Sequence, residues 1–239
     1  MLRIAHRGAS GHRPEHTVAA YDLAIELGAD LIELDVRRTR DGEPVVLHDE
    51  TLDRTVRGAT GPVADRTLAE ARAGDTGDGP VLTLREVLER YAGRVGLLVE
   101  VKPGPRPIDL ERRVVELLGE HGLLGPGGAI LQSFDIAAVK RLAGLAPDTC
   151  RHQLFDAVAT PQAGRWLGGV ASYATGIAPW HGSVDTALVD AAHAAGLAVH
   201  AHTVNDAGDM ARLAAAGVDG IITDLPDRLA AVLETPVAA

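Results

Sequence analysis

The sequence predicts an α/β fold, a single (β/α)₈ TIM barrel, from its length, its alternation of elements and the lack of one motif. The chain has 239 residues, close to the roughly 250 residues of a typical barrel of this kind. Short apolar runs alternate with amphipathic stretches about eight times, a pattern typical of a parallel sheet with helical crossovers. The glycine-rich dinucleotide fingerprint does not follow the first apolar run, which favours a closed barrel over an open, doubly wound sheet.

The individual elements follow from the spacing of apolar residues. Strands are predicted over Leu2–Ala5, Asp30–Val36, Pro44–Leu47, Gly96–Lys102, Ala129–Gln132, Cys150–Leu154, Val170–Ile177, Leu197–His202 and Gly220–Ile222. Helices are predicted over residues 17–29, 83–93, 108–122, 135–144, 184–196 and 206–217. Several of these helical stretches end in glycine, the residue expected just beyond a helix C-terminus.

One segment, residues 49–80, breaks the alternation. It is polar and rich in glycine, and at about thirty residues it is too long for an ordinary connection within a domain. The sequence therefore predicts a lid or small subdomain inserted after the second strand region of a single barrel domain over residues 1–239. The alternative is a surface loop without function. A function is favoured because the segment begins directly after His48, a candidate active-site residue.

Composition and charge exclude several classes of protein. The net charge is −10, from 23 basic and 33 acidic residues, so nucleic acid is not expected as a partner. The apolar runs are shorter than the ~20 residues of a membrane span, and the opening segment is too short in apolar residues for a signal peptide. Cys150 is the single cysteine, so no intrachain disulfide can form. We expect a cytoplasmic protein without a stable membrane anchor, and its oligomeric state stays open.

Acidic residues occur where the predicted barrel should be filled with apolar side chains. Residues two apart on a strand share a face, so Glu33 and Asp35 point together into the barrel, as do Glu100 and Lys102 on a second strand. Three buried acids would repel one another. Lys102 can neutralise one charge, and a divalent cation, Mg²⁺ or Ca²⁺, can offset the rest. The alternative is an ion-pair network without a metal.

Histidine and arginine follow the predicted strands at their carboxyl ends, where barrel enzymes place their active sites. His6 and Arg7 follow the first strand, and His48 follows the third. Imidazole can give or take a proton near neutral pH, and a guanidinium group suits a phosphate. His202 shares a strand face with His200 and can line the barrel interior, whereas His12 and His16 are assigned no function.

Several motifs together resemble the glycerophosphodiester phosphodiesterase family. They are HRGASGHRPEHT at 6–17, ELDVRRTRDGEPVVLHDETLDRT at 33–55, LTLREVL at 82–88, VEVK at 99–102, LQSFD at 131–135, TVND at 203–206 and GVDGIITDLPD at 217–227. The resemblance covers nearly the whole chain. It implies a TIM barrel that uses one divalent cation to hydrolyse glycerophosphodiesters, small molecules, to glycerol 3-phosphate and an alcohol.

The resemblance also implies roles for individual residues. His6 and His48 match the acid–base pair, with His6 favoured as the base. Arg7 matches the phosphate-binding arginine, and the metal ligands match Glu33, Asp35 and Glu100. Lys102 matches the lysine beside these ligands, and we expect it to bind the phosphate as well. Position in the predicted barrel, not the resemblance, adds two residues to the expected substrate-binding set: Glu15, near the mouth, and His202, on an inward strand face. Glu15 could instead have a structural role near the first helix.

Two positions depart from the family pattern, and two other functions stay possible. His16 replaces the Asn of P-E-N-T, and His202 replaces the Trp before T-V-N, which puts the pocket for the alcohol or glycerol in question. The alternatives are a lysophospholipase D-type phosphodiesterase that acts on longer lipid analogues, and a non-catalytic barrel that binds polyol phosphates. Release of glycerol 3-phosphate with and without a chelator would distinguish an enzyme from a binding protein.

Overall fold

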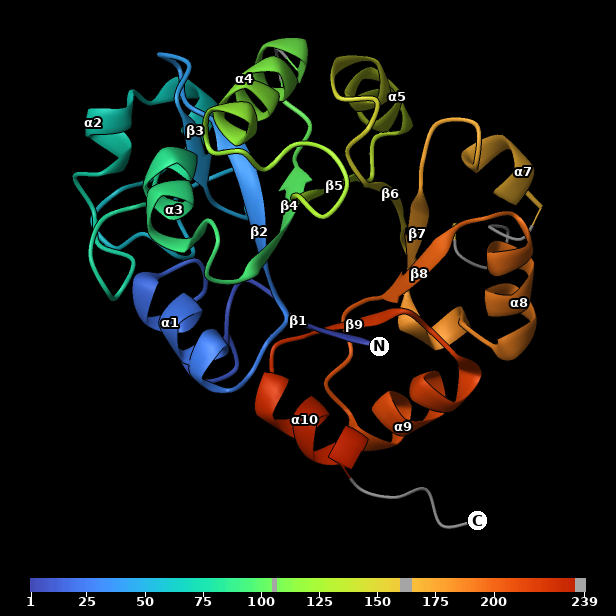
Figure 1. The fold of residues 1–239 in the computed structure, drawn as a ribbon. Helices are drawn as coiled ribbons and strands as arrows, with labels where there is room; N and C mark the ends of the chain where they lie inside the picture. The colour runs from blue at the N-terminus through green and yellow to red at the C-terminus, as the bar shows by residue number, and fades with distance from the viewer. Residues whose placement is uncertain (105–106, 160–164, 235–239) are drawn as a thin grey trace.

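A closed barrel of parallel strands forms the centre of the computed structural model (Figure 1). The structure describes residues 1–104, 107–159 and 165–234. Within these ranges the strands are β1 (Leu2–Ala5), β2 (Leu31–Arg38), β3 (Pro44–Val46), β4 (Gly96–Val101), β5 (Ile130–Ser133), β6 (Arg151–Phe155), β7 (Gly176–Pro179), β8 (Ala198–Ala201) and β9 (Gly220–Thr223). Strand β1 pairs in parallel with both β2 and β9, which closes the ring, and β3 lies antiparallel on β2. The predicted (β/α)₈ barrel is therefore confirmed.

The strand register places the acidic side chains in one layer inside the barrel and apolar side chains in the layer below it. On β2 and β4, Asp35 lies opposite Glu100, while Glu33 lies opposite Leu98. Below the acids, Leu98 packs with Ile4, Leu31 and Ile222 in one buried cluster of side chains from four strands. Apolar residues thus fill the lower part of the barrel and leave the carboxylates at its carboxyl end.

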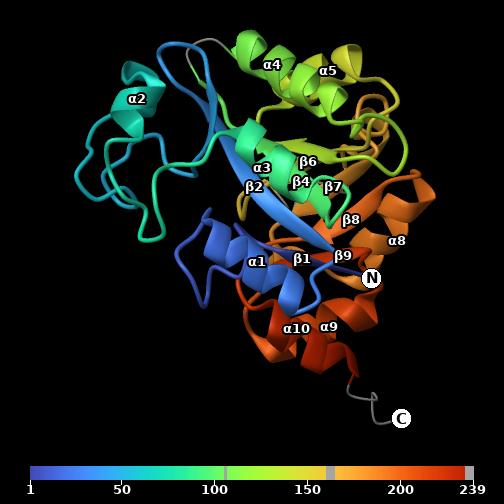
Figure 2. The ribbon, with the colours of Figure 1, turned by 60° about the vertical axis from the view of Figure 1, so that its left-hand side comes forward.

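Helices surround the barrel on the outside, as Figures 1 and 2 show. They are α1 (Val18–Glu26), α2 (Leu68–Ala71), α3 (Leu84–Tyr91), α4 (Pro107–Glu120), α5 (Ile136–Leu145), α7 (Leu167–Val170), α8 (Thr186–Ala194), α9 (Ala207–Ala216) and α10 (Pro226–Glu234), with short 3₁₀ turns η1 (Val63–Asp65) and η2 (His181–Ser183). Thr17 caps α1, and Asp206 caps α9, each by accepting a backbone N–H. Gly217 ends α9 in the left-handed conformation expected of a C-terminal glycine.

The prediction of a strand over Val170–Ile177 was wrong in its first half. Leu167–Val170 forms α7, a turn follows, and β7 begins only at Gly176. Leu167, Val170 and Ala174 are spaced three and four residues apart and are all buried in one apolar cluster. That spacing is helical, so the apolar run combined the end of a helix with the start of a strand.

Residues 49–80 form a small substructure that includes η1 and α2, and Figure 2 shows it to one side of β2. Two isolated β-bridges, Thr51 with Pro62 and Arg57 with Asp75, hold its loops together. Its buried apolar side chains pack on residues of β3 and of the segment before α3; the cluster consists of Val45, Leu47, Leu52, Val56, Val63, Ala71 and Val81. The segment is therefore anchored to the barrel by apolar packing.

Across the described ranges, no helix combines the length and the apolar character that a membrane crossing requires.

Candidate active site

Three carboxylates meet at the carboxyl end of the barrel. Glu33 and Asp35 come from β2 and Glu100 from β4, and one oxygen of each lies within 4.8 Å of the others. All three side chains are buried. The alternation of residues along β2 and the register of β2 with β4 bring them together. Among residues 1–104, 107–159 and 165–234, this is the one acidic or histidine cluster with metal-binding spacing.

Lys102 is the nearest positive charge to this cluster. Its Nζ atom lies 2.9 Å from Oδ1 of Asp35 and 2.6 Å from Oε1 of Glu100. Burial alone would raise the pKa of Asp35, but the charge of Lys102 and the hydrogen bond from His16 hold it well below its usual value. Burial and the charge of Asp35 raise the pKa of Glu100 to about 7, and burial also raises the pKa of Glu33. One lysine therefore does not compensate three acids.

The acidic cluster fits a divalent cation. A cation would offset the charge that Lys102 leaves uncompensated, and it would lower the raised pKa values of Glu33 and Glu100. The ligand set contains only carboxylate oxygens, which suit hard cations better than zinc. Glu33, Asp35 and Glu100 could thus hold a metal ion at the mouth of the barrel.

Arg7 links the acidic cluster to the loop after β1. Its backbone N–H donates to Oε2 of Glu33 at 3.0 Å, and its Nε lies 3.3 Å from Oδ2 of Asp35. Arg7 has a φ of +57°, a region that costs energy for a residue with a side chain. Gly8 follows at φ +83°, and a Cβ there would lie 2.8 Å from the backbone of Ala20. A glycine is therefore required directly after Arg7.

Glu15 holds Arg7 rather than facing the cavity. Its carboxylate accepts a hydrogen bond from Arg7 at 3.1 Å and two from Arg54 at 2.7 and 2.8 Å. Burial would raise the pKa of Glu15, but the Arg54 hydrogen bond and the Arg7 charge lower it to about 2. Glu15 is thus ionised at neutral pH and fixes the orientation of the Arg7 guanidinium group.

Each of the two candidate catalytic histidines is held by a carboxylate through its Nδ1 atom. His6 Nδ1 lies 2.6 Å from Oδ1 of Asp224, and His48 Nδ1 lies 2.7 Å from Oδ1 of Asp49. Asp224 also accepts hydrogen bonds from Ser10 and Asn205. A carboxylate on Nδ1 fixes the ring and leaves Nε2 for proton transfer.

The electrostatic surroundings keep both supporting carboxylates ionised. Burial would raise the pKa of Asp224, but hydrogen bonds from His6, Asn205 and Ser10 lower it to about 2. Arg54 holds the pKa of Asp49 below its usual value with hydrogen bonds at 2.6 and 2.9 Å. Burial lowers the pKa of His48, although the charge of Asp35 opposes this effect.

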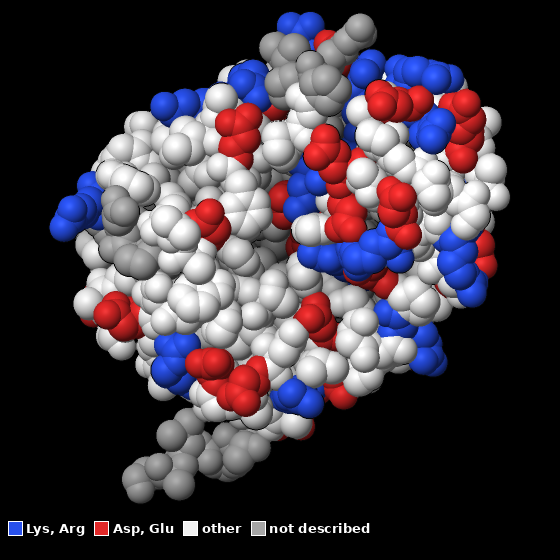
Figure 3. Space-filling view, turned by 180° about the vertical axis from the view of Figure 1, so that it is seen from behind, with Lys and Arg blue, Asp and Glu red and all other residues white. Residues whose placement is uncertain are grey.

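A cavity of about 150 Å³ connects these groups. Seven of the nine residues expected at the site line it, namely His6, Arg7, Glu33, His48, Glu100, Lys102 and His202. Asp35 lies buried beneath them and Glu15 lies behind Arg7. Figure 3 shows one face of the molecule hollowed near its middle, with acidic and basic side chains gathered along one side of the hollow.

His202 forms part of the cavity wall in a neutral state. Its Nε2 lies 3.2 Å from the carbonyl oxygen of Phe155, and its ring meets the edge of Phe134 at 5.7 Å between centroids. Burial lowers the pKa of His202 to about 4, so the ring is neutral at pH 7. His200, on the same strand face, packs against His152 instead and does not line this cavity.

Sequence reasoning missed several residues that hold the site, among them His16 and Asp224. His16 was assigned no function, but it is buried, with Nε2 at 2.9 Å from Oδ2 of Asp35 and Nδ1 at 2.9 Å from the hydroxyl of Tyr21. Asp224 was also overlooked. Asp224 directly follows β9, and active-site residues of barrel enzymes lie at the carboxyl ends of strands. The same rule, which selected His6 after β1, could therefore have identified Asp224.

Known proteins are similar to this chain over nearly its whole length. The model of the glycerophosphoryl diester phosphodiesterase family matches residues 6–228. A glycerophosphodiester phosphodiesterase of Bacillus subtilis is 36% identical over 95% of this chain and 84% of its own length, and one of Caldanaerobacter subterraneus is 35% identical over 95% and 96%. The solved structure of an Oleispira antarctica phosphodiesterase with its product sn-glycerol-3-phosphate aligns with a TM-score of 0.87 at 28% identity, covering 97% of this chain and 96% of that one.

Proposed function

The chain belongs to the glycerophosphoryl diester phosphodiesterase family, and we propose that it hydrolyses glycerophosphodiesters to glycerol 3-phosphate and an alcohol. The observation that supports this function most directly is that two carboxylate-held histidines, His6 and His48, line one cavity with two members of the buried acidic cluster. The product sn-glycerol-3-phosphate in the Oleispira antarctica structure supports a small-molecule substrate of this class.

The phosphodiester would lie between the acidic cluster and the two histidines. Arg7 and Lys102 supply positive charge for the phosphoryl oxygens, whose negative charge increases in the transition state. Glu15 supports this role because it holds the Arg7 side chain in place before substrate binds. Preorganised charge of this kind reduces the reorganisation that accompanies the reaction.

His6 and His48 would form the acid–base pair. One histidine takes a proton from the nucleophile and the other gives one to the leaving oxygen, each transfer contributing typically 10²–10⁴-fold. The nucleophile we favour is the neighbouring glycerol hydroxyl, which would give a cyclic phosphate, because an attached hydroxyl is already close to phosphorus. A water molecule would then open the ring.

Glu33, Asp35 and Glu100 would hold one divalent cation, Mg²⁺ or Ca²⁺. The raised pKa values of Glu33 and Glu100 without a metal support this assignment, as does the all-oxygen ligand set. When bound, the cation supplies a Lewis acid that offsets negative charge on the phosphoryl oxygens. Lys102 keeps Asp35 and Glu100 oriented toward the same point.

The dimensions and polarity of the cavity favour small, water-soluble diesters over lysolipids. The cavity measures about 150 Å³ and is lined largely by charged and polar side chains. Acyl chains would require an extended apolar surface. A non-catalytic barrel that binds polyol phosphates is also disfavoured. Such a protein would not need the two histidines or the carboxylates that hold them, and both are present.

The test is the release of glycerol 3-phosphate from glycerophosphoglycerol, with Mg²⁺, with Ca²⁺ and with a chelator. We expect activity with at least one cation, loss of activity with the chelator, and at least a hundredfold loss in His6→Ala and His48→Ala. Lysophosphatidylglycerol serves as the lipid comparison. Full activity in the chelator, or in either folded histidine variant, would refute the assignment.

A further inference from the structure

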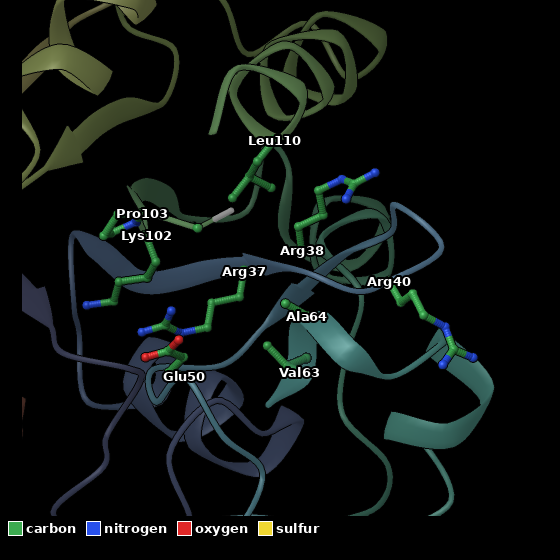
Figure 4. A pocket seen from close by; sticks show the side chains of 10 residues that line it. Arg37, Arg38, Arg40, Glu50, Val63, Ala64, Lys102, Pro103 and Leu110 are labelled. Carbon is green, nitrogen blue, oxygen red and sulfur yellow. The ribbon is translucent and has the colours of Figure 1, made fainter. Parts of the chain in front are cut away.

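A second cavity adjoins the candidate active site and has no role in the chemistry described so far. It measures about 160 Å³, several times the roughly 30 Å³ that a water molecule occupies in the liquid. Its wall is formed by β2, by η1 of the inserted segment and by the chain after β4. Lys102 lines both cavities, so the two are neighbours (Figure 4). We call it the Arg37 pocket.

Arg37 occupies this pocket because of its place on β2. Glu33, Asp35 and Arg37 are spaced two residues apart, so they share the face of the strand that points into the barrel. Arg37 lies one step beyond the acidic cluster, toward the mouth. In Figure 4 its guanidinium group and the Lys102 side chain extend toward the same end of the pocket.

The guanidinium group of Arg37 has unused hydrogen-bonding capacity. Its Nε donates to the carbonyl oxygen of His48 at 2.8 Å. In the part of the chain that the structure describes, neither terminal nitrogen of Arg37 forms a hydrogen bond or ion pair. The Arg38 side chain likewise forms none there. A half-buried, forked donor of this kind matches a phosphate or carboxylate.

The remaining charges of the pocket also favour an anion. Arg40 lines it as well and is bound to Glu70 and to the backbone of Asp65. Glu50 is the single acidic lining residue among those described, and Figure 4 shows its carboxylate beside the Arg37 guanidinium group. Among the described residues, basic side chains therefore outnumber acidic ones in the pocket lining, with Arg37, Arg38, Arg40 and Lys102 against Glu50.

We propose that the Arg37 pocket binds a phosphate monoester on the alcohol half of the substrate, so that the enzyme prefers glycerophosphodiesters with a phosphorylated alcohol. This proposal rests on the proposed function. Lys102 lines both cavities, so the scissile phosphate lies beside the Arg37 pocket only if the substrate binds in the candidate active site. The apolar wall of Val63, Ala64 and Leu110 would contact the carbon skeleton of the alcohol.

The test compares two substrates that differ by one phosphate, glycerophosphoinositol and glycerophosphoinositol 4-phosphate. The quantity measured is the ratio of their kcat/KM values, which cancels any effect of a variant on the shared chemistry. We expect a ratio of at least ten in favour of the phosphorylated substrate. Arg37→Gln should lower the ratio about tenfold, the loss expected for one charge-assisted contact. Arg38→Gln should lower it less, because the Arg38 guanidinium group points away from those of Arg37 and Lys102 in Figure 4.

Two variants serve as controls on this ratio. Glu50→Gln removes the negative charge from the pocket and should raise the ratio. Arg94→Gln removes an exposed arginine just before β4, at the opposite end of the barrel, and should leave it unchanged. The proposal is overturned if the wild-type ratio is near one, or if Arg37→Gln and Arg94→Gln change the ratio equally. In either case, hydrolysis of glycerophosphoinositol would still uphold the proposed function. Hydrolysis of neither substrate in the presence of cation overturns both.

Discussion

His6 Nδ1 lies 2.6 Å from Oδ1 of Asp224, and this contact joins the ends of β1 and β9 where the barrel closes. The backbone of His6 also donates to Thr223 at 2.8 Å, so the histidine is fixed by both its main chain and its ring. Asp224 is itself held by Ser10 and Asn205. The ring therefore has one orientation, with Nε2 left for the reaction.

Replacement of Asp224 by Asn should lower kcat by about 10²–10⁴-fold with little change in KM. An amide can donate to Nδ1, and the proton would then reside on Nε2 in the wrong tautomer. The measurement is steady-state hydrolysis of glycerophosphoglycerol, together with circular dichroism to confirm folding. Asp227→Asn is the matched control, because Asp227 contacts His12 at 2.9 Å in a similar pair outside the cavity. Equal activity of the two variants would contradict the assignment.

His16 should control the affinity for the cation through Asp35. Its Nε2 lies 2.9 Å from Oδ2 of Asp35, and its Nδ1 is held by the Tyr21 hydroxyl. His16→Phe removes the hydrogen bond, and we expect cation binding to weaken about 10–100-fold, as is usual for residues that orient metal ligands. His16→Asn keeps a donor and should retain most of the affinity. Calorimetric titration with Mg²⁺ and Ca²⁺ measures this, and equal affinities in all three proteins would refute the role.

The acidic cluster was predictable, whereas the role of His16 was not. Alternation along a strand is a local rule, so the sequence itself places Glu33 and Asp35 on one face. His16 reaches Asp35 only because the loop after β1 turns back, with positive φ angles at both Arg7 and His16. Non-glycine residues rarely adopt such angles, and no sequence pattern predicts them.

Other differences between sequence and structure have similarly local causes. Arg37 follows the same alternation as the acids and could have been identified by extending the pattern two residues. Glu15 was expected to contact substrate, but its ion pairs with Arg7 and Arg54 depend on the inserted segment, which supplies Arg54. The path of that segment depends on apolar contacts among scattered residues such as Leu52 and Val63, and these have no periodic signal.

Glu100 should make the stability of the cation-free protein depend on pH. Burial and Asp35 raise its pKa to about 7 in the folded state, from 4.5 when unfolded. The resulting stabilisation is fully present below pH 4.5 and is lost as pH rises through 7. In chelator, the free energy of unfolding contributed by Glu100 should fall by about 2–3 kcal/mol between pH 5 and pH 8.

Urea unfolding of the wild type and of Glu100→Gln, each in chelator, measures this contribution as a difference between two pH profiles. Added cation binds the ionised carboxylates, so it should stabilise the wild type more at pH 8 than at pH 5. Parallel profiles for the two proteins in chelator would show that Glu100 titrates normally.

His200 should produce the opposite pH dependence. Its ring is 2% exposed and lies 4.4 Å from the ring of His152, and burial lowers its pKa to about 4, from 6.5 when unfolded. A depressed histidine pKa means that the unfolded chain binds the proton more tightly. The stabilisation is therefore present above pH 6.5 and is lost as pH falls toward 4, by about 2 kcal/mol between pH 7 and pH 5.

Substitution of His200 by Gln removes this titration, so the variant should lose less stability than the wild type between pH 7 and pH 5 in urea unfolding. His193→Gln is the control, because His193 is exposed on α8 and contacts Asp219 at 2.9 Å. Its profile should follow that of the wild type. If stability fell equally with pH in the wild type and in His200→Gln, the folded barrel would accept a proton on the His200 ring. We expect that protonation to be costly, because two buried imidazoles pack edge to face there.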